Sequence, residues 1–185
     1  MISFDDFLEL VIARRTELMM DQERGVEMHL VEKLCTAAAW APNHQKTWPW
    51  LFGVFTGDGR RTLGEVTAEA MQARGDGEPK VTKTRTKYLR SPVLLVVGTA
   101  PGETELQTQE NRDAVAAGIQ TLLLGATAMG LGSFWSSCPK GANDTVAAHC
   151  GWPTGTHITA MIYLGWPMVT LPDRERPAAN IKYFG

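Results

Sequence analysis

Apolar residues in the first forty positions recur every three or four residues, which is the spacing of amphipathic helices. A first helix is predicted to begin at Ser3, a residue type that caps helices well, and to end at Arg14 and Arg15. A second helix is predicted over residues 26–40, because Pro42 cannot continue it. Its apolar stripe consists of Leu30, Val31, Leu34, Cys35 and Ala38.

Short, continuous apolar runs predict buried strands at residues 50–55, 92–98 and 158–164. The run PVLLVVG at residues 92–98 has no polar alternation, so we expect a central strand that is covered on both faces. A shorter strand is predicted at residues 133–136, and the end of the chain, residues 180–185, is predicted to be extended.

The longest predicted helix covers residues 109–129, and it is apolar on nearly every side after Ala114, which favours a central position. Helices and strands alternate without a repeat or a low-complexity linker, so residues 1–185 are predicted to form one α+β or α/β layered domain. The other predicted segments are a turn at 57–59, a helix at 60–73, surface loops with a short helix at 74–87, and a helix from Asn143 or Asp144 to His149.

Composition supports a soluble, globular protein, because 44% of the 185 residues are hydrophobic and 21% are charged. A net charge of -2 provides no general basic surface for nucleic acid. The three cysteines include no CxxC pair, which indicates free thiols and a cytoplasmic location. The sequence shows neither an export signal nor an apolar run long enough to span a membrane. No histidine and cysteine spacing is typical of a metal site.

The segment APNHQKTWPW at residues 41–50 is unusually rich in indole, since Trp40, Trp48 and Trp50 fall within eleven positions. Its two prolines predict a shaped loop that either holds a flat ligand or is covered by another chain. His44 in this loop is either bonded to the backbone or in contact with a ligand.

Arg14, Arg15 and Thr16 form a second candidate site. Cations at the carboxyl end of a helix complement its dipole, which is the ordinary explanation. The functional alternative is an anion clamp, since a phosphate is well bound by guanidinium groups beside a hydroxyl.

Two further stretches have candidate chemistry. The glycine-rich run at residues 125–132 ends a helix, whereas a Rossmann fingerprint opens one after a strand, so a dinucleotide fold is disfavoured. Small residues there also permit close helix packing. Trp135, Ser136 and Ser137 are either core and turn or the backbone and indole that face a bound ring system. Nucleophile-elbow and Walker sequences are absent.

Taken in order, these pieces resemble the compact branch of the FMN-dependent nitroreductase family. The matching stretches are VIARRT, AAAWAPNHQKTWPWLFGVF, RSPVLLVVGT, ENRDAVAAGIQTLLLGATAMGLGSFWSS, ITAMIYLGWP and a closing aromatic tail. The resemblance implies an α+β, nitroreductase-like fold, with a mainly antiparallel sheet flanked by helices, in an intertwined homodimer. FMN would lie at the interface of the two subunits.

The resemblance also implies roles for individual residues. Those matching Arg14, Arg15 and Thr16 grip the flavin phosphate and ribityl end, and Lys182 lies where larger relatives have a phosphate-binding cation. The residues matching Trp40 and His44 come from the partner subunit. Trp135, Ser136 and Ser137 would lie along the ring. The nicotinamide nucleotide is expected near Gly125, Ala126, Thr127, Ala128, Met129 and Gly130.

The activity implied by the resemblance is ping-pong reduction of a small, flat nitroaromatic or quinone acceptor, with NADH or NADPH as co-substrate and no catalytic acid or base from the protein. Two residues depart from the family pattern: Leu18 replaces a cation, and Trp48 replaces an amide. These departures keep an alternative open, namely a flavin-binding sensor or carrier without turnover.

Overall fold

A four-stranded antiparallel sheet forms the centre of the protein, with the strand order β1-β2-β4-β3. The computed structural model describes residues 2–172 and 174–185. The inner strands, β2 and β4, are almost entirely buried. The strands are β1 (Trp50–Phe55), β2 (Val93–Thr99), β3 (Gly132–Ser136) and β4 (His157–Gly165).

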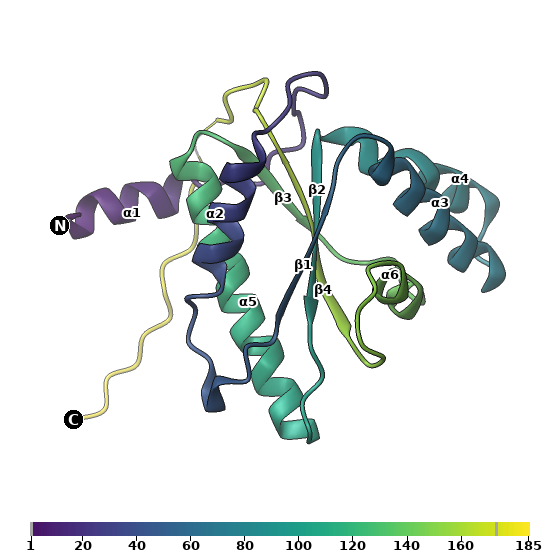
Figure 1. The fold of residues 1–185 in the computed structure, drawn as a ribbon. Helices are drawn as coiled ribbons and strands as arrows, with labels where there is room; N and C mark the ends of the chain where they lie inside the picture. The colour runs from purple at the N-terminus through teal and green to yellow at the C-terminus, as the bar shows by residue number, and fades with distance from the viewer. Residues whose placement is uncertain (1, 173) are drawn as a thin grey trace.

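Helices cover both faces of this sheet (Figure 1). Helices α2 and α5 lie on one side, and α3, α4 and α6 lie on the other. The helices of the described residues are α1 (Phe4–Ala13), α2 (Met28–Ala38), α3 (Gly57–Ala73), α4 (Glu78–Thr86), α5 (Glu105–Ala128) and α6 (Asn143–His149), with short 3-10 turns at His44–Lys46 and Lys87–Arg90. This arrangement confirms the predicted α+β class with a flanked antiparallel sheet.

Strand β2 divides the hydrophobic core into two layers. Leu95 and Val97 pack with residues of α2 and α5, whereas Leu94 and Val96 pack with residues of α3 and α6. Successive side chains of a strand point to opposite faces, so a strand covered on both sides must be apolar at every position. The prediction of a central strand from the run PVLLVVG is confirmed.

Three local predictions were wrong. Strand β1 is only partly buried, because it pairs with β2 alone and lies at the sheet edge. The predicted turn at residues 57–59 is the first turn of α3. Neither Asn143 nor Asp144 caps α6, whose N-cap is Ala142. The Asn143 side chain is instead used in tertiary bonds: it accepts from the Ile158 N–H at 2.7 Å and donates to the Thr156 carbonyl at 2.9 Å.

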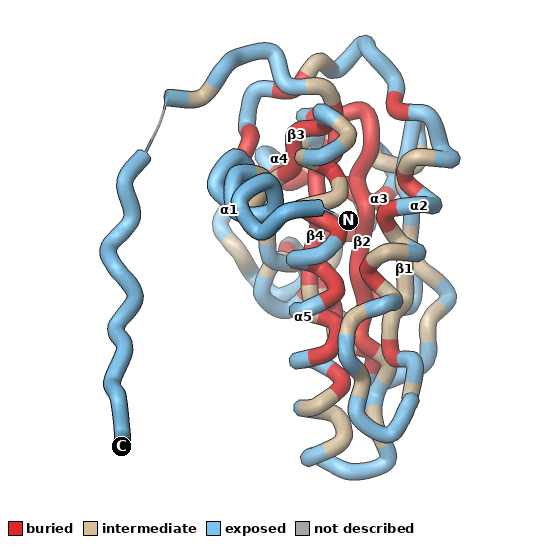
Figure 2. Tube along the Cα trace, turned by 90° about the vertical axis from the view of Figure 1, so that its left-hand side faces the viewer, coloured by how far each residue is buried: buried red, intermediate tan, exposed pale blue. Residues whose placement is uncertain are grey.

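The two ends of the chain lie outside the core (Figure 2). Helix α1 begins with the predicted Ser3 cap but contains no buried residue, and Phe4 and Ile12 are 72% and 65% exposed. The segment after residue 173 runs apart from the body of the molecule without regular structure. Helix α5 packs on the sheet, yet its opposite side remains open to solvent, which corrects the prediction of a fully central helix.

Candidate functional site

The chain that follows α1 is fixed along the free edge of strand β3. Thr16 forms a parallel bridge with Ser133, and the Glu17 N–H donates to the Ser133 carbonyl at 2.9 Å. Farther on, Met20 bridges to Pro167. These backbone bonds set the positions of Arg14, Arg15 and Thr16, the three residues predicted to bind an anion.

Those three residues line one cavity of about 340 Å³. Arg174, Glu175 and Arg176 line the same cavity, so four arginines and one glutamate gather around it and the arginines outnumber the carboxylate. Burial, followed by the nearby guanidinium groups of Arg176 and Arg15, lowers the pKa of Arg14 from its usual value. None of the four arginines forms an ion pair with another described residue. Like charges held together in this way would be stabilised by an anion.

Arg174 and Arg176 were missed by the sequence reasoning, which placed the tail cation at Lys182. Lys182 is exposed and is not among the residues that line this cavity. Arg15 helps to hold the tail segment here, because its guanidinium donates to the Pro172 carbonyl at 3.0 Å. The sequence feature that could have pointed to Arg174 and Arg176 is the short run RER directly before Pro177.

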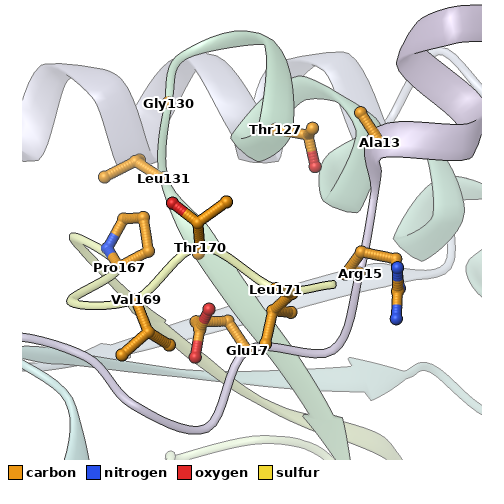
Figure 3. A pocket seen from close by; sticks show the side chains of 11 residues that line it. Ala13, Arg15, Glu17, Thr127, Gly130, Leu131, Pro167, Val169, Thr170 and Leu171 are labelled. Carbon is orange, nitrogen blue, oxygen red and sulfur yellow. The ribbon is translucent and has the colours of Figure 1, made fainter. Parts of the chain in front are cut away.

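A second cavity, of about 370 Å³, adjoins the first and shares Arg15 and Leu171 with it (Figure 3). Its wall includes Glu17, Thr127 and Thr170. Glu17 is only 4% exposed, and one of its carboxylate oxygens accepts from the Met19 N–H at 2.7 Å. No described residue bonds its other oxygen, which is therefore an available acceptor for a ligand N–H or O–H.

Glycine at position 132 makes room for this carboxylate. A Cβ atom there would lie 2.7 Å from the Glu17 Cγ atom. Nothing in the sequence marked Glu17, since its role depends on the close approach of the edge segment to β3. The two adjoining cavities therefore combine a cationic end with an end that carries an acceptor and hydroxyl groups.

The residues predicted to meet the nicotinamide nucleotide lie at the carboxyl end of α5. Thr127 and Gly130 line the second cavity, while Ala126 is buried in the core. The Thr127 hydroxyl donates to the Leu123 carbonyl at 3.1 Å, which leaves its lone pairs available. Gly130 has a φ of +75°, a left-handed conformation that suits glycine at a helix end. Gly125 lies where a Cβ would come within 2.8 Å of Leu34. Ala128 is the last residue of α5, and Met129 is its C-cap.

Trp135, Ser136 and Ser137 continue from β3 along the sheet edge. Trp135 is 38% exposed, and the Ser136 hydroxyl has only a long bond, 3.4 Å, to the Ser137 carbonyl. They are not among the residues that line the two adjoining cavities. An exposed indole with unengaged polar groups beside it is suited to contact a flat ligand.

The aromatic loop lies at the other half of α5. The His44 Nδ1 atom is 2.9 Å from the Glu110 Oε2 atom, and Trp40 and Trp48 are 84% and 64% exposed. Trp50 is different, because it packs against the α2–α5 core as part of β1. Residues 110 and 127 are separated by about 25 Å along the helix, at a rise of about 1.5 Å per residue. His44 and the predicted nucleotide-binding residues thus lie near opposite ends of α5.

Two classes of feature are not found among the described residues. No group of three or more His, Cys, Asp and Glu side chains is placed to hold a metal ion. No helix within residues 2–172 and 174–185 has the length and apolar character needed to cross a membrane.

The fold is shared with solved proteins of the nitroreductase-like class. A nitroreductase-like family protein from Bacillus cereus is 24% identical, with a TM-score of 0.81 over 96% of this chain and 94% of that one. A nitroreductase from Bacteroides fragilis with bound FMN is 19% identical, with a TM-score of 0.77 over 96% and 98%. An FMN-dependent nitroreductase from Mycobacterium smegmatis in complex with NADPH is 20% identical, with a TM-score of 0.69 over 88% and 87%.

The sequence leads to the same class. A model described as the nitroreductase family matches residues 11–166. The chain belongs to the nitroreductase family. A search of curated proteins found no match to the sequence.

Proposed function

We propose that this chain is an FMN-dependent NAD(P)H oxidoreductase that acts as a homodimer. The observation that carries the proposal is the cluster of four arginines beside β3, in which like charges crowd around Thr16. The cluster lies next to β3, and Trp135 and Ser136 belong to this same edge strand, with Ser137 directly after it. The FMN bound to the Bacteroides fragilis protein and the FMN dependence of the Mycobacterium smegmatis enzyme support the choice of ligand.

The residues present fit the parts of FMN. Arg14, Arg15 and Thr16 would hold the phosphate together with Arg174 and Arg176, since a phosphate dianion prefers several guanidinium donors and a hydroxyl. Trp135, Ser136 and Ser137 would lie along the ring system. When bound, FMN would supply the hydride chemistry, and the chain would bind and orient the reactants.

The proposed site needs two copies of the chain. His44 contacts Glu110 in the amino-terminal half of α5, whereas the cavities that Arg15 lines adjoin Thr127 at its carboxyl end. These two positions are about 25 Å apart along the helix, so one flavin held at the arginines would not also contact His44 of the same chain. A second copy, related by a twofold axis, would bring its Trp40 and His44 to the first copy's arginines.

Exposed apolar residues at both ends of the chain support the same proposal. Phe4, Phe7 and Ile12 of α1 and Tyr183 and Phe184 of the tail are between 42% and 91% exposed. Large exposed apolar side chains of this kind are typical of interfaces, where aromatic side chains are enriched. We propose that each chain covers the other with these two ends, as an intertwined homodimer.

The co-substrate and acceptor complete the proposal. NADH or NADPH would bind at residues 125–130, where Glu17 and Thr127 offer acceptors to a carboxamide. The NADPH present in the Mycobacterium smegmatis structure supports a nicotinamide nucleotide. The electron acceptor would be a small, flat nitroaromatic or quinone. The proposed location is the cytoplasm, since Cys35, Cys138 and Cys150 are free thiols.

The visible spectrum of the purified protein tests this proposal. We expect a flavin spectrum that is bleached by anaerobic addition of NADH or NADPH and restored by menadione. A protein that stays colourless when FMN is added would overturn the cofactor assignment. Bound FMN that neither nucleotide reduces would favour the alternative of a flavin-binding protein without turnover, for which the exposed residues Leu18 and Trp48 are the motivating features.

A further inference from the structure

The aromatic loop has an unusual backbone. Gln45, Lys46 and Trp48 have φ values of 61°, 54° and 52°, although none of them is glycine. Left-handed backbone is unfavourable for such residues, and it persists only where the surrounding structure imposes it. Such positions cluster at ligand and active sites, so the contacts that impose this conformation are of functional interest.

A chain of side-chain hydrogen bonds imposes it. The Trp48 N–H donates to the Asn43 Oδ1 atom at 2.8 Å, and the Asn43 amide donates to the Thr47 hydroxyl at 3.0 Å. The Thr47 hydroxyl in turn donates to the Asn111 Oδ1 atom at 2.5 Å. Asn111 thereby joins the strained loop to helix α5.

Asn111 is the rigid end of this chain of bonds. It is 2% exposed, and its amide also donates to the Ala100 carbonyl at 3.2 Å. The Ala100 N–H donates to the Pro49 carbonyl at 2.9 Å, so the bonds close on the residue next to Trp48. Asn111 is the first buried residue of α5, and a buried amide is costly unless both of its polar atoms are bonded. Here both are used to hold the loop.

The result of this arrangement is an indole that is held in place yet left open. Trp48 is 64% exposed, whereas the neighbouring Trp50 packs into the core. The two rings are tilted, with centroids 6.4 Å apart. The Trp48 indole is exposed although its backbone is held in a strained conformation. It is therefore placed to contact a molecule outside its own chain.

We propose that Asn111 is a positioning residue that fixes Trp48 as a wall of the acceptor pocket, and so determines which flat acceptors the enzyme reduces. The inference rests on the proposed function. Beyond that function, the inference assigns a role to Asn111, which lies in the core and would touch no ligand. Asn111 acts through Thr47 and Asn43. The His44 imidazole is held by Glu110, and only the His44 backbone carbonyl accepts from the Asn43 amide, at 3.2 Å. Loss of Asn111 should therefore affect acceptor binding more than FMN binding.

The test uses Asn111→Leu and Thr47→Val in the FMN-loaded protein, with menadione as acceptor. Each variant should raise the KM for menadione about tenfold, because small misplacements of a binding group have effects of this size or larger. FMN occupancy and the bleaching by nucleotide should remain. The double variant should resemble either single variant, since both cut the same connection. Acrylamide should quench Trp48 fluorescence more strongly in each variant, with Trp48→Phe as the reference.

Asn143→Leu is the matched control. Asn143 also bonds two backbone groups, the Thr156 carbonyl and the Ile158 N–H of β4, but it lies on α6, on the other side of the sheet. It should lower stability without changing the KM for menadione. An Asn111→Leu enzyme with full FMN, normal turnover and an unchanged KM for menadione would overturn this inference but not the proposed function. A wild-type protein without FMN would overturn the proposed function, and the inference with it.

Discussion

Apolar residues are buried in the inner strands of the sheet but exposed at the two ends of the chain. Leu95 and Ile162 of the inner strands are 0% exposed, whereas Ile12 of α1 is 65% exposed and Phe184 of the tail is 91% exposed. The core is completed by helices of the same chain on both faces of the sheet. The ends have no such cover within the described residues, and this exposure is the reason for proposing that a second copy of the chain covers them.

The same contrast applies to polar groups. Buried Asn111 and partly buried Asn143 have both polar atoms of their amides bonded to other parts of the chain. At the edge, Arg14 and the arginines around it crowd like charges into one cavity. Satisfied polar groups hold elements together, while unsatisfied ones mark the places where another molecule binds.

The largest effect is expected from charges on α1. Phe7→Asp together with Ile12→Asp should weaken the proposed dimer by more than about 100-fold, because central apolar residues dominate interface energies. The sheet should still fold, since α1 contributes no buried residue. Light scattering on a sizing column measures the mass of each species. Glu9→Gln on the polar side of α1 is the control, and equal masses for all variants and wild type would contradict the comparison.

A smaller effect is expected at the arginine cluster. Arg14→Ala should weaken FMN binding by about 10- to 100-fold, which corresponds to the loss of a charge-assisted hydrogen bond. Chemistry on the flavin that remains should change little. Fluorescence titration with FMN measures the affinity. Arg61→Ala, an exposed arginine on α3, should bind FMN normally. An Arg14→Ala protein with full FMN and no turnover would count against the assigned role.

The smallest effect is expected at Lys87, a partly buried lysine in the 3-10 turn before β2. Burial lowers the pKa of its ammonium group from the ordinary 10.5 to about 8. Below pH 8 both the folded and unfolded forms are protonated, so the cost of burying the charge is fully present there. The cost falls as pH rises from 8 to 10.5, because the unfolded chain then binds more protons than the folded one.

Lys87→Met should therefore stabilise the protein at pH 7 by about 1–2 kcal/mol, a value reduced for the partial exposure of the group. The gain should disappear near pH 10.5. Urea unfolding at several pH values measures it. Lys83→Met, which removes an exposed lysine of α4, should show no such pH dependence. A gain at Lys87 that is constant with pH would show that burial of charge is not its cause.

Much of the fold could be predicted from local pattern. The strands β2 and β4 follow from continuous apolar runs, and α5 follows from its length and its closing glycine. Strand β1 was misjudged, because an apolar run does not reveal whether a strand has one neighbour or two. The cap of α6 was misjudged because Asn143 bonds residues that follow it by 13 and 15 positions. Local propensity contains no information about such partners.

The candidate site, like the fold, could be predicted from the sequence only in part. The sequence by itself determined the residue types and the family: Arg14, Arg15 and Thr16 after a helix, an indole-rich loop, and the order of the motifs along the chain. Only the tertiary structure revealed that Arg174 and Arg176 join the first group, that Glu17 lines the adjoining cavity, and that Asn111 holds the loop. These relations depend on distances between segments remote in sequence, and such distances are set by packing of the whole chain.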